Sequence, residues 1–129
     1  MTVQARLDEL TERSNLVEGF LSFALLVHGD RAIQGSVYDG ETWITARSAP
    51  GAVTEGRGFE CTYSCRSRFG SHLYLDGALV GWDRRAPVAI NPVSWPFGLN
   101  IGGWPDADAF MFKGRLSVVR LWREQQFDD

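Results

Sequence analysis

The sequence predicts an all-β protein, folded as an antiparallel sandwich or barrel. Short runs rich in β-branched and aromatic residues recur along the chain, and clusters of glycine, proline, asparagine and aspartate separate them. Two dipeptides, Asp39-Gly40 and Asp76-Gly77, each lie between such runs, and Asp-Gly tolerates the positive φ values of a tight hairpin turn. Helical patterns do not alternate with the runs, so a parallel α/β sheet is not expected.

Length and composition fit one globular domain spanning residues 1–129. The chain has 129 residues, of which 44% are hydrophobic and 22% charged, and this mixture supports a packed core. The net charge is −3 and the basic residues are scattered, so nucleic acid is not an expected partner. No apolar run approaches the ~18 residues of a membrane span, so a membrane is not an expected partner either.

The first ten residues are polar and lack the basic leader and apolar centre of a signal peptide. We therefore expect a cytoplasmic protein, unless the chain is a mature or excised domain.

Residues 2–17 are ambiguous between helix and strand. Val3, Leu7 and Leu10 approximate one helical face, and the composition of the segment favours a helix. Val3, Ala5 and Leu7 also alternate with polar residues, as an edge strand would. Of these two alternatives we predict a short N-terminal helix.

The middle of the chain predicts a series of strands. Gly19–Val27 is almost continuously apolar, as expected of a central strand that is buried on both faces. Ala32–Tyr38 and Glu41–Arg47 flank the first Asp-Gly turn, and we place Trp43, within the second of them, in the core or at its edge. Apolar and polar residues alternate in Phe59–Cys65, which predicts one buried and one solvated face.

The last part of the chain predicts a hairpin and further strands. Leu73–Val80 contains the second Asp-Gly turn, and short strands are expected at Val88–Ile90 and Leu99–Gly102. In Phe110–Trp122 the apolar positions change parity along the run, and we place Trp122, at its end, in the core or at its edge. Either both faces of this strand are buried, or a bulge near Ser117 shifts its register.

Four segments in the second half of the chain also carry a resemblance to a known family. In order, they are Phe59–Tyr63, Leu73–Val80, Leu99–Gly103 and Phe112–Trp122. They resemble the second half of a concanavalin A-like lectin/glucanase domain of the laminin G-like type. Such domains show a strand ending in Thr-Tyr, a Leu-Tyr-x-Asp-Gly hairpin, an Ile-Gly-Gly strand end and a final strand ending in Arg-x-Trp. The resemblance covers residues 59–122, about half of the chain, and the first half matches only loosely.

The resemblance implies a two-sheet jelly-roll sandwich that binds carbohydrate or protein, sometimes through calcium. We interpret the chain as a non-catalytic binding module for a carbohydrate or a similar polar ligand at the loop ends. The alternative is a structural or assembly protein that forms homo-oligomers through an exposed sheet edge or face. A glycosidase is the third interpretation, because no strand has the paired carboxylates that this chemistry uses.

Candidate ligand-binding residues lie in and around the predicted loops. Trp82, Trp95 and Trp104 fall in or beside loops, where an indole can stack on the apolar face of a sugar. Asn100, in the predicted strand Leu99–Gly102, is the fourth candidate ligand-binding residue. The competing interpretation is that these aromatic rings cap the two ends of the sandwich.

A calcium site is the one cofactor candidate, and no catalytic residue is predicted. Asp106 and Asp108 place two carboxylates on one loop, although calcium takes six or more oxygen ligands. A solvated turn is the competing interpretation of this loop. Cys61 and Cys65 would stand roughly 13 Å apart on one strand, too far for a disulfide, and we interpret them as small buried thiols.

Overall fold

The computed structural model describes residues 1–10, 12–66, 69–85, 89–94, 97–103 and 110–122. Within these ranges the chain forms ten strands and no helix. The strands are β1 Thr2–Glu9, β2 Ser14–Gly19, β3 Phe23–Val27, β4 Ile33–Tyr38, β5 Trp43–Arg47, β6 Gly58–Arg66, β7 Gly70–Leu75, β8 Ala78–Asp83, β9 Leu99–Ile101 and β10 Lys113–Arg120.

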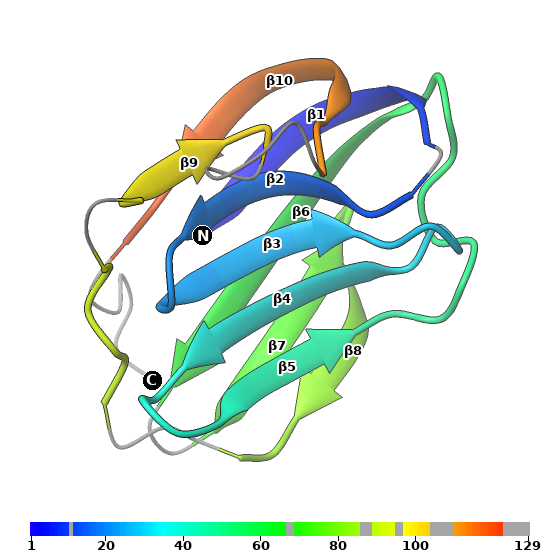
Figure 1. The fold of residues 1–129 in the computed structure, drawn as a ribbon. Helices are drawn as coiled ribbons and strands as arrows, with labels where there is room; N and C mark the ends of the chain where they lie inside the picture. The colour runs from blue at the N-terminus through cyan, green and yellow to red at the C-terminus, as the bar shows by residue number, and fades with distance from the viewer. Residues whose placement is uncertain (11, 67–68, 86–88, 95–96, 104–109, 123–129) are drawn as a thin grey trace.

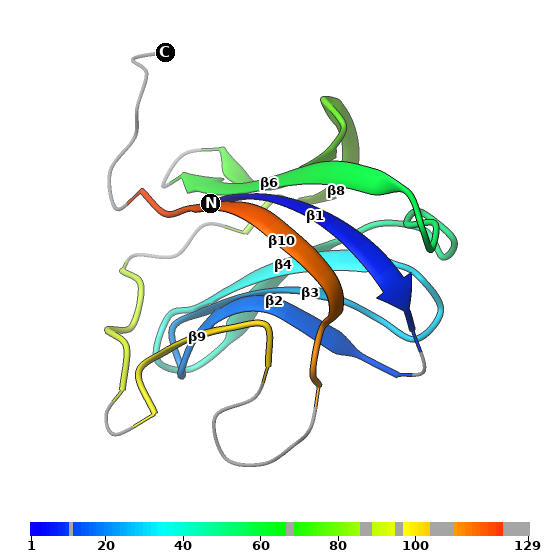
Figure 2. The same cartoon turned by 90° about the horizontal axis from the view of Figure 1, so that it is seen from above.

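The strands form two antiparallel sheets that pack face to face. Sheet I has the strand order β10-β1-β6-β7-β8, and sheet II has the order β5-β4-β3-β2-β9. In Figure 1 sheet II crosses the front of the molecule and sheet I lies behind it. Figure 2 views the molecule from above and shows the two layers one over the other. The predicted all-β, two-sheet sandwich is therefore confirmed.

The core lies between the two sheets and consists of the side chains that point inward from both of them. Tyr63 of β6 is buried, and its hydroxyl donates a hydrogen bond to the carbonyl of Ile44, 3.2 Å away. Its ring lies directly against the backbone of Gly35 in β4, where a Cβ atom would overlap the ring. Val3, Leu25 and the other inward residues complete the apolar layer.

The two long sides of the sandwich differ. On one side β5 approaches β8 so closely that a Cβ atom at Gly81 would lie 2.8 Å from the carbonyl oxygen of Arg47. On the other side, β9 leaves Leu99 and Ile101 exposed, at 52% and 57% of their surface. One side of the sandwich is thus closed by backbone contact, and the other exposes apolar side chains of β9.

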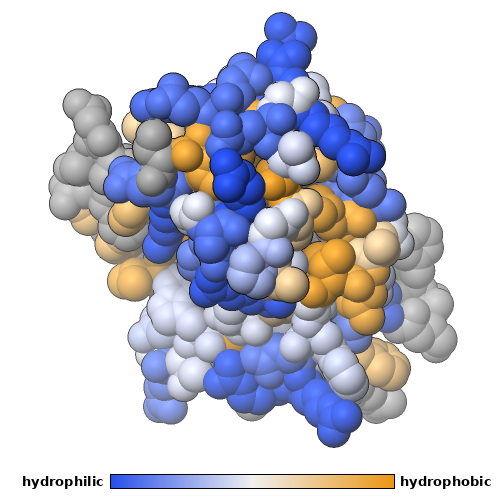
Figure 3. All heavy atoms as spheres, turned by 90° about the vertical axis from the view of Figure 1, so that its right-hand side faces the viewer, coloured by the Kyte–Doolittle hydropathy of each residue, from blue (hydrophilic) through white to orange (hydrophobic). Residues whose placement is uncertain are grey.

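Figure 3 looks onto the end of the sandwich where the loops after β3 and β5 turn, and shows hydrophobic areas between hydrophilic ones. Exposed ion pairs tie this end together, Arg31–Glu55 at 2.8 Å and Arg47–Asp30 at 2.9 Å. In the described part of the chain, no helix is long and apolar enough to cross a membrane.

The predicted N-terminal helix in residues 2–17 is wrong. Residues 2–9 form β1, which pairs with β10 on one side and with β6 on the other. Val3, Ala5 and Leu7 point into the core at alternate positions, so the two-residue period of the segment outweighs its helical composition. The rest of the segment enters β2 at Ser14.

Other predictions are confirmed or refined. Asp76 and Gly77 have φ values of 49° and 83°, as a tight hairpin turn requires. The register of β10 on β1 skips Ser117, so the expected bulge lies there. The strand expected at 19–27 is shorter, because Gly19 ends β2 and β3 begins at Phe23. No strand is seen at residues 89–90, and Val88 lies outside the described residues.

Candidate functional site

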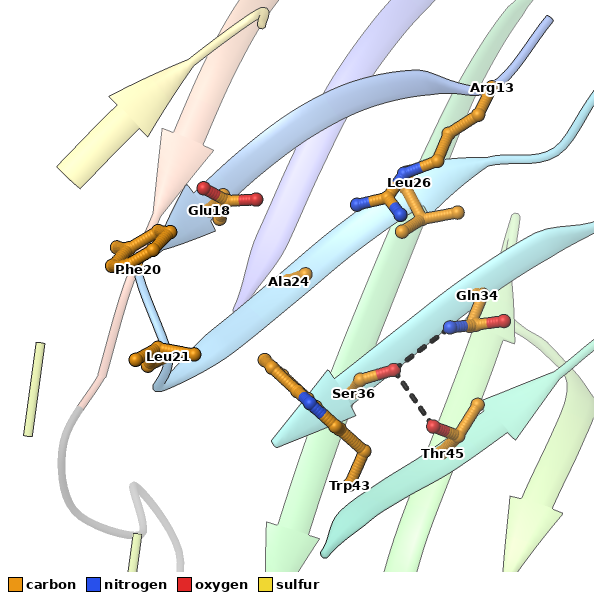
Figure 4. A pocket seen from close by; sticks show the side chains of 10 residues that line it. All are labelled: Arg13, Glu18, Phe20, Leu21, Ala24, Leu26, Gln34, Ser36, Trp43 and Thr45. Atoms are coloured by element: carbon orange, nitrogen blue, oxygen red, sulfur yellow. Dashed lines mark hydrogen bonds between the residues drawn. The ribbon is translucent and has the colours of Figure 1, made fainter. Parts of the chain in front are cut away.

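The outer face of sheet II, on the side away from sheet I, holds a groove with a volume of about 290 Å³. Strand alternation places the lining there: Leu25 and Val27 point into the core, so Ala24 and Leu26 point outward. The residues that line the groove are Arg13, Glu18, Phe20, Leu21, Ala24, Leu26, Gln34, Ser36, Trp43 and Thr45 (Figure 4).

Strand register brings a row of side chains together on the floor of the groove. Glu18 of β2 pairs with Ala24 of β3, Ala24 with Ser36 of β4, and Ser36 with Thr45 of β5. The Ser36 and Thr45 hydroxyls are hydrogen-bonded at 3.0 Å, and the amide of Gln34 donates to the Ser36 hydroxyl at 3.0 Å (Figure 4). Ala24 is the smallest member of the row, and its short side chain leaves the hollow between Glu18 and the hydroxyls.

Glu18 is a buried carboxyl group in this polar row. The residue is only 4% exposed, its Oε2 accepts a hydrogen bond from the Asn15 amide at 3.4 Å, and its Oε1 has no hydrogen-bond partner among the described residues. Burial raises the pKa of the Glu18 carboxyl, and the charge of Arg13 offsets part of that rise. The groove lining therefore contains a buried acceptor whose hydrogen-bonding capacity the described residues do not fill.

Arg13 supplies a cation at the margin of the groove. Its Nε donates to the Asn15 side-chain oxygen at 2.9 Å, and its guanidinium lies over the Phe110 ring, 4.5 Å from the ring centre. Burial lowers the pKa of the Arg13 guanidinium and Glu18 opposes this change, but an arginine side chain stays protonated in proteins. The position of the cation is thus fixed by packing as well as by hydrogen bonding.

Aromatic and aliphatic side chains form the opposite end of the groove. Trp43 is 39% exposed, and its ring lies 5.0 Å from that of Tyr38 at an angle of 31°. Leu21, on the turn between β2 and β3, has a φ of 56°, and its carbonyl accepts a hydrogen bond from the Asn91 amide at 2.8 Å. The backbone N–H of Ser94 similarly donates a hydrogen bond to the carbonyl of Phe20, 3.0 Å away. These bonds hold the main chain at this end of the groove.

The buried state of Glu18 should make stability depend on pH. Because folding raises its pKa above the ordinary value of 4.5, the unfolded chain releases this proton first. The free energy of unfolding therefore falls as pH rises through the window between the two pKa values. We expect Glu18→Gln to raise the melting temperature at pH 7 and to flatten this decline, measured by thermal denaturation between about pH 4 and 8. The control is Glu60→Gln on the exposed face of β6, and an E18Q melting temperature at or below wild type at pH 7 would contradict the assignment.

Of the ligand-binding residues predicted from sequence, the two that the structure describes, Trp82 and Asn100, do not line this groove. Trp82 lies in β8, on the outer face of sheet I, where it is 52% exposed and stacked with His72 at a ring distance of 6.1 Å. Asn100 of β9 pairs in register with Glu18, beside the groove, and its side-chain amide donates to the carbonyl of Phe97 at 2.9 Å. The predicted Trp95 and Trp104 lie outside the described residues.

The predicted calcium ligands, Asp106 and Asp108, also lie outside the described residues, so calcium binding stays a prediction. Elsewhere, in the residues that the structure describes, no group of three or more His, Cys, Asp or Glu side chains could hold a metal ion. Cys61 is buried and Cys65 is half-buried, and neither forms a disulfide. Burial raises the pKa of the Cys61 thiol to about 12, so it stays protonated at neutral pH.

None of the residues that line the groove was predicted from the sequence to bind a ligand. Trp43 was expected in the core or at its edge; it does lie on an edge strand, but more than a third of it is exposed. Trp122 was assigned likewise and is exposed after the end of β10. Glu18 has a detectable signal, because it is a lone carboxylate between the apolar Leu16-Val17 pair and the run that follows.

No protein-family model and no curated protein matches this chain. Solved structures do match its fold: the CBM40 of the Ruminococcus gnavus IT-sialidase bound to α2,3-sialyllactose aligns with a TM-score of 0.66 at 18% identity, over 88% of this chain and 68% of that one. The same module without a named ligand gives 0.65 at 19%, with 88% and 68% covered. Its α2,6-sialyllactose complex gives 0.64 at 18%, with 88% and 69% covered. At this identity, the likeness concerns the fold.

Proposed function

We propose that this chain is a non-catalytic carbohydrate-binding module whose sugar site is the groove on the outer face of sheet II. The observation that carries the proposal is the polar row of Glu18, Ser36 and Thr45 beside the exposed ring of Trp43. A sugar ring has an apolar C–H face that stacks on an indole, and hydroxyls that exchange hydrogen bonds with such polar groups. The row and the ring supply both kinds of contact within one hollow.

The fold supports the same function. The matching modules from Ruminococcus gnavus are described as bound to α2,3- and α2,6-sialyllactose, so this kind of sandwich serves carbohydrate binding elsewhere. Among the described residues that line the groove, Glu18 is the one carboxylate. A glycosidase ordinarily uses two carboxyl groups, one on each side of the bond it cleaves. The lining therefore favours binding over hydrolysis.

The electrostatics of the groove favour a sugar with an acidic group. Arg13 holds a positive charge at the margin of the groove, and a guanidinium is well suited to a carboxylate. Sialyl glycans contain a carboxylate, hydroxyls and an amide, so they are the first class to test.

A glycan array followed by calorimetry with α2,3-sialyllactose tests this function. We expect saturable binding by wild type, and an affinity about tenfold weaker for Trp43→Ala, which corresponds to about 1.4 kcal/mol for the lost stacking surface. Trp82→Ala is the matched control, because it removes an exposed indole from the outer face of the other sheet. Absence of binding to every glycan on the array would reject the proposal, and equal losses in the two variants would reject the groove as the site.

Self-association is a second candidate function. The exposed Leu99 and Ile101 of β9, at the edge of sheet II, provide the apolar surface for a second copy. Size-exclusion chromatography with light scattering tests it, and a monomer at high concentration would reject it.

A further inference from the structure

The polar floor of the groove continues beyond its lining, along the outer face of sheet II. Gln34 links the two regions, since its amide nitrogen donates to Ser36 inside the groove at 3.0 Å and its Oε1 lies 2.6 Å from the Nε2 of His28. His28 follows the last residue of β3 and does not line the groove. Hydrogen bonds therefore connect the groove hydroxyls to the turn after β3.

Arg47 and Asp30 border the same region. Arg47 is the register partner of Gln34, and because Ala46 points into the core, Arg47 points outward beside it. Its guanidinium pairs with Asp30 at 2.9 Å, and Asp30 also accepts a hydrogen bond from the backbone of Ala32 at 2.9 Å. Both charged side chains are exposed, at 44% and 43%, so they are held in place yet open to a ligand.

The outer face of sheet II continues from the groove toward these residues. Hydrogen bonds to the main-chain carbonyls of Leu21 and Phe20 hold the end of the groove beside Trp43. From Ala24 to His28 the strand advances four residues, roughly 13 Å at about 3.3 Å per residue. That length exceeds one sugar ring, so the face is long enough for a second ring beyond the groove.

We propose that His28, Gln34 and Arg47, with Asp30, form a second sugar subsite that binds the sugar next to the one in the groove. This inference rests on the proposed function. A sugar hydroxyl both donates and accepts, so it can receive a hydrogen bond from Arg47 and give one to Asp30. The subsite makes the protein prefer an oligosaccharide to its terminal monosaccharide.

Calorimetry with two probes tests the subsite: N-acetylneuraminic acid, which fills only the groove, and α2,3-sialyllactose, which extends beyond it. We expect wild type to bind the trisaccharide at least about fivefold more tightly, a gain within the net value of one or two hydrogen bonds. Arg47→Ala and His28→Ala should each reduce that ratio toward one and leave the affinity for the monosaccharide unchanged. Arg6→Ala, which breaks an exposed ion pair on sheet I, is the control and should keep the wild-type ratio.

The possible failures are distinguishable. If the ratio of the trisaccharide affinity to the monosaccharide affinity is the same in wild type and in both variants, the subsite is overturned and the groove remains. If both variants weaken the two probes equally, His28 and Arg47 act on the groove itself, and the subsite is again overturned. If wild type binds neither probe, the proposed function fails for sialyl glycans and the subsite fails with it.

Discussion

Ala24→Trp is expected to abolish saccharide binding, with a loss of more than about 100-fold, and to leave the fold intact. Ala24 occupies the centre of the cross-strand row between Glu18 and Ser36, and its methyl group points away from the core. An indole at this position fills the hollow that the ligand needs. Because the change lies on the outer face of sheet II, it creates no overlap between the sheets.

The control for this variant is Ser64→Trp, an outward position on β6 at the middle of sheet I. Circular dichroism should show that both variants keep the β-sheet spectrum and melt near the wild-type temperature, and calorimetry with α2,3-sialyllactose should separate them. Unchanged affinity in a folded Ala24→Trp variant would place the ligand elsewhere on the molecule.

Tyr63→Ala is expected to lower the free energy of unfolding by about 3–5 kcal/mol, the range for removing a large aromatic side chain from a core. Tyr63 is 2% exposed, its ring fills the space over Gly35, and its hydroxyl bonds to the Ile44 carbonyl of the facing sheet. The substitution opens a cavity between the sheets and leaves that carbonyl with one bond fewer. Urea denaturation followed by tryptophan fluorescence measures the change.

Tyr74→Ala on the outer face of sheet I is the matched control, and it should cost less than about 1.5 kcal/mol because no cavity forms. A Tyr63→Ala variant as stable as the Tyr74→Ala variant would contradict the assignment of Tyr63 to the centre of the core.

The hairpins and the strands of the second half were predictable because their signals are local. The Asp-Gly turn at residues 76–77 needs two positive φ values, and those are what it has. In β6 the alternation from Phe59 to Tyr63 shows directly which side chains are buried. The bulge at Ser117 was detectable because the parity of the apolar positions changes there.

The N-terminal segment was predicted wrongly because its composition favours a helix, whereas the two-residue period of its apolar positions favours a strand. Helix-favouring residue types surround Val3, Ala5 and Leu7, but pairing with two neighbouring strands offers this segment more hydrogen bonds and more burial than a short helix could. That gain depends on β6 and β10, which lie far away in sequence. A local pattern could not reveal it.

The groove was hidden for a related reason. Its floor combines β2, β3, β4 and β5, and which residues meet there depends on the register between strands. In β3 the outward residues Ala24 and Leu26 are apolar and only 6% and 2% exposed, as predicted for a strand buried on both faces, so the strand's own sequence does not indicate a groove. Trp43 was assigned to the core or its edge because it lies within a predicted strand.

The most direct test of the sugar site on sheet II is a nuclear magnetic resonance titration of the ¹⁵N-labelled protein with α2,3-sialyllactose. The indole N–H signals of Trp43 and Trp82 report on the outer faces of the two different sheets. We expect the Trp43 signal and the backbone amides around Glu18, Ala24 and Ser36 to shift with one common saturation curve, while Trp82 stays unchanged. Saturable shifts confined to Trp82 and the strands of sheet I would contradict the account.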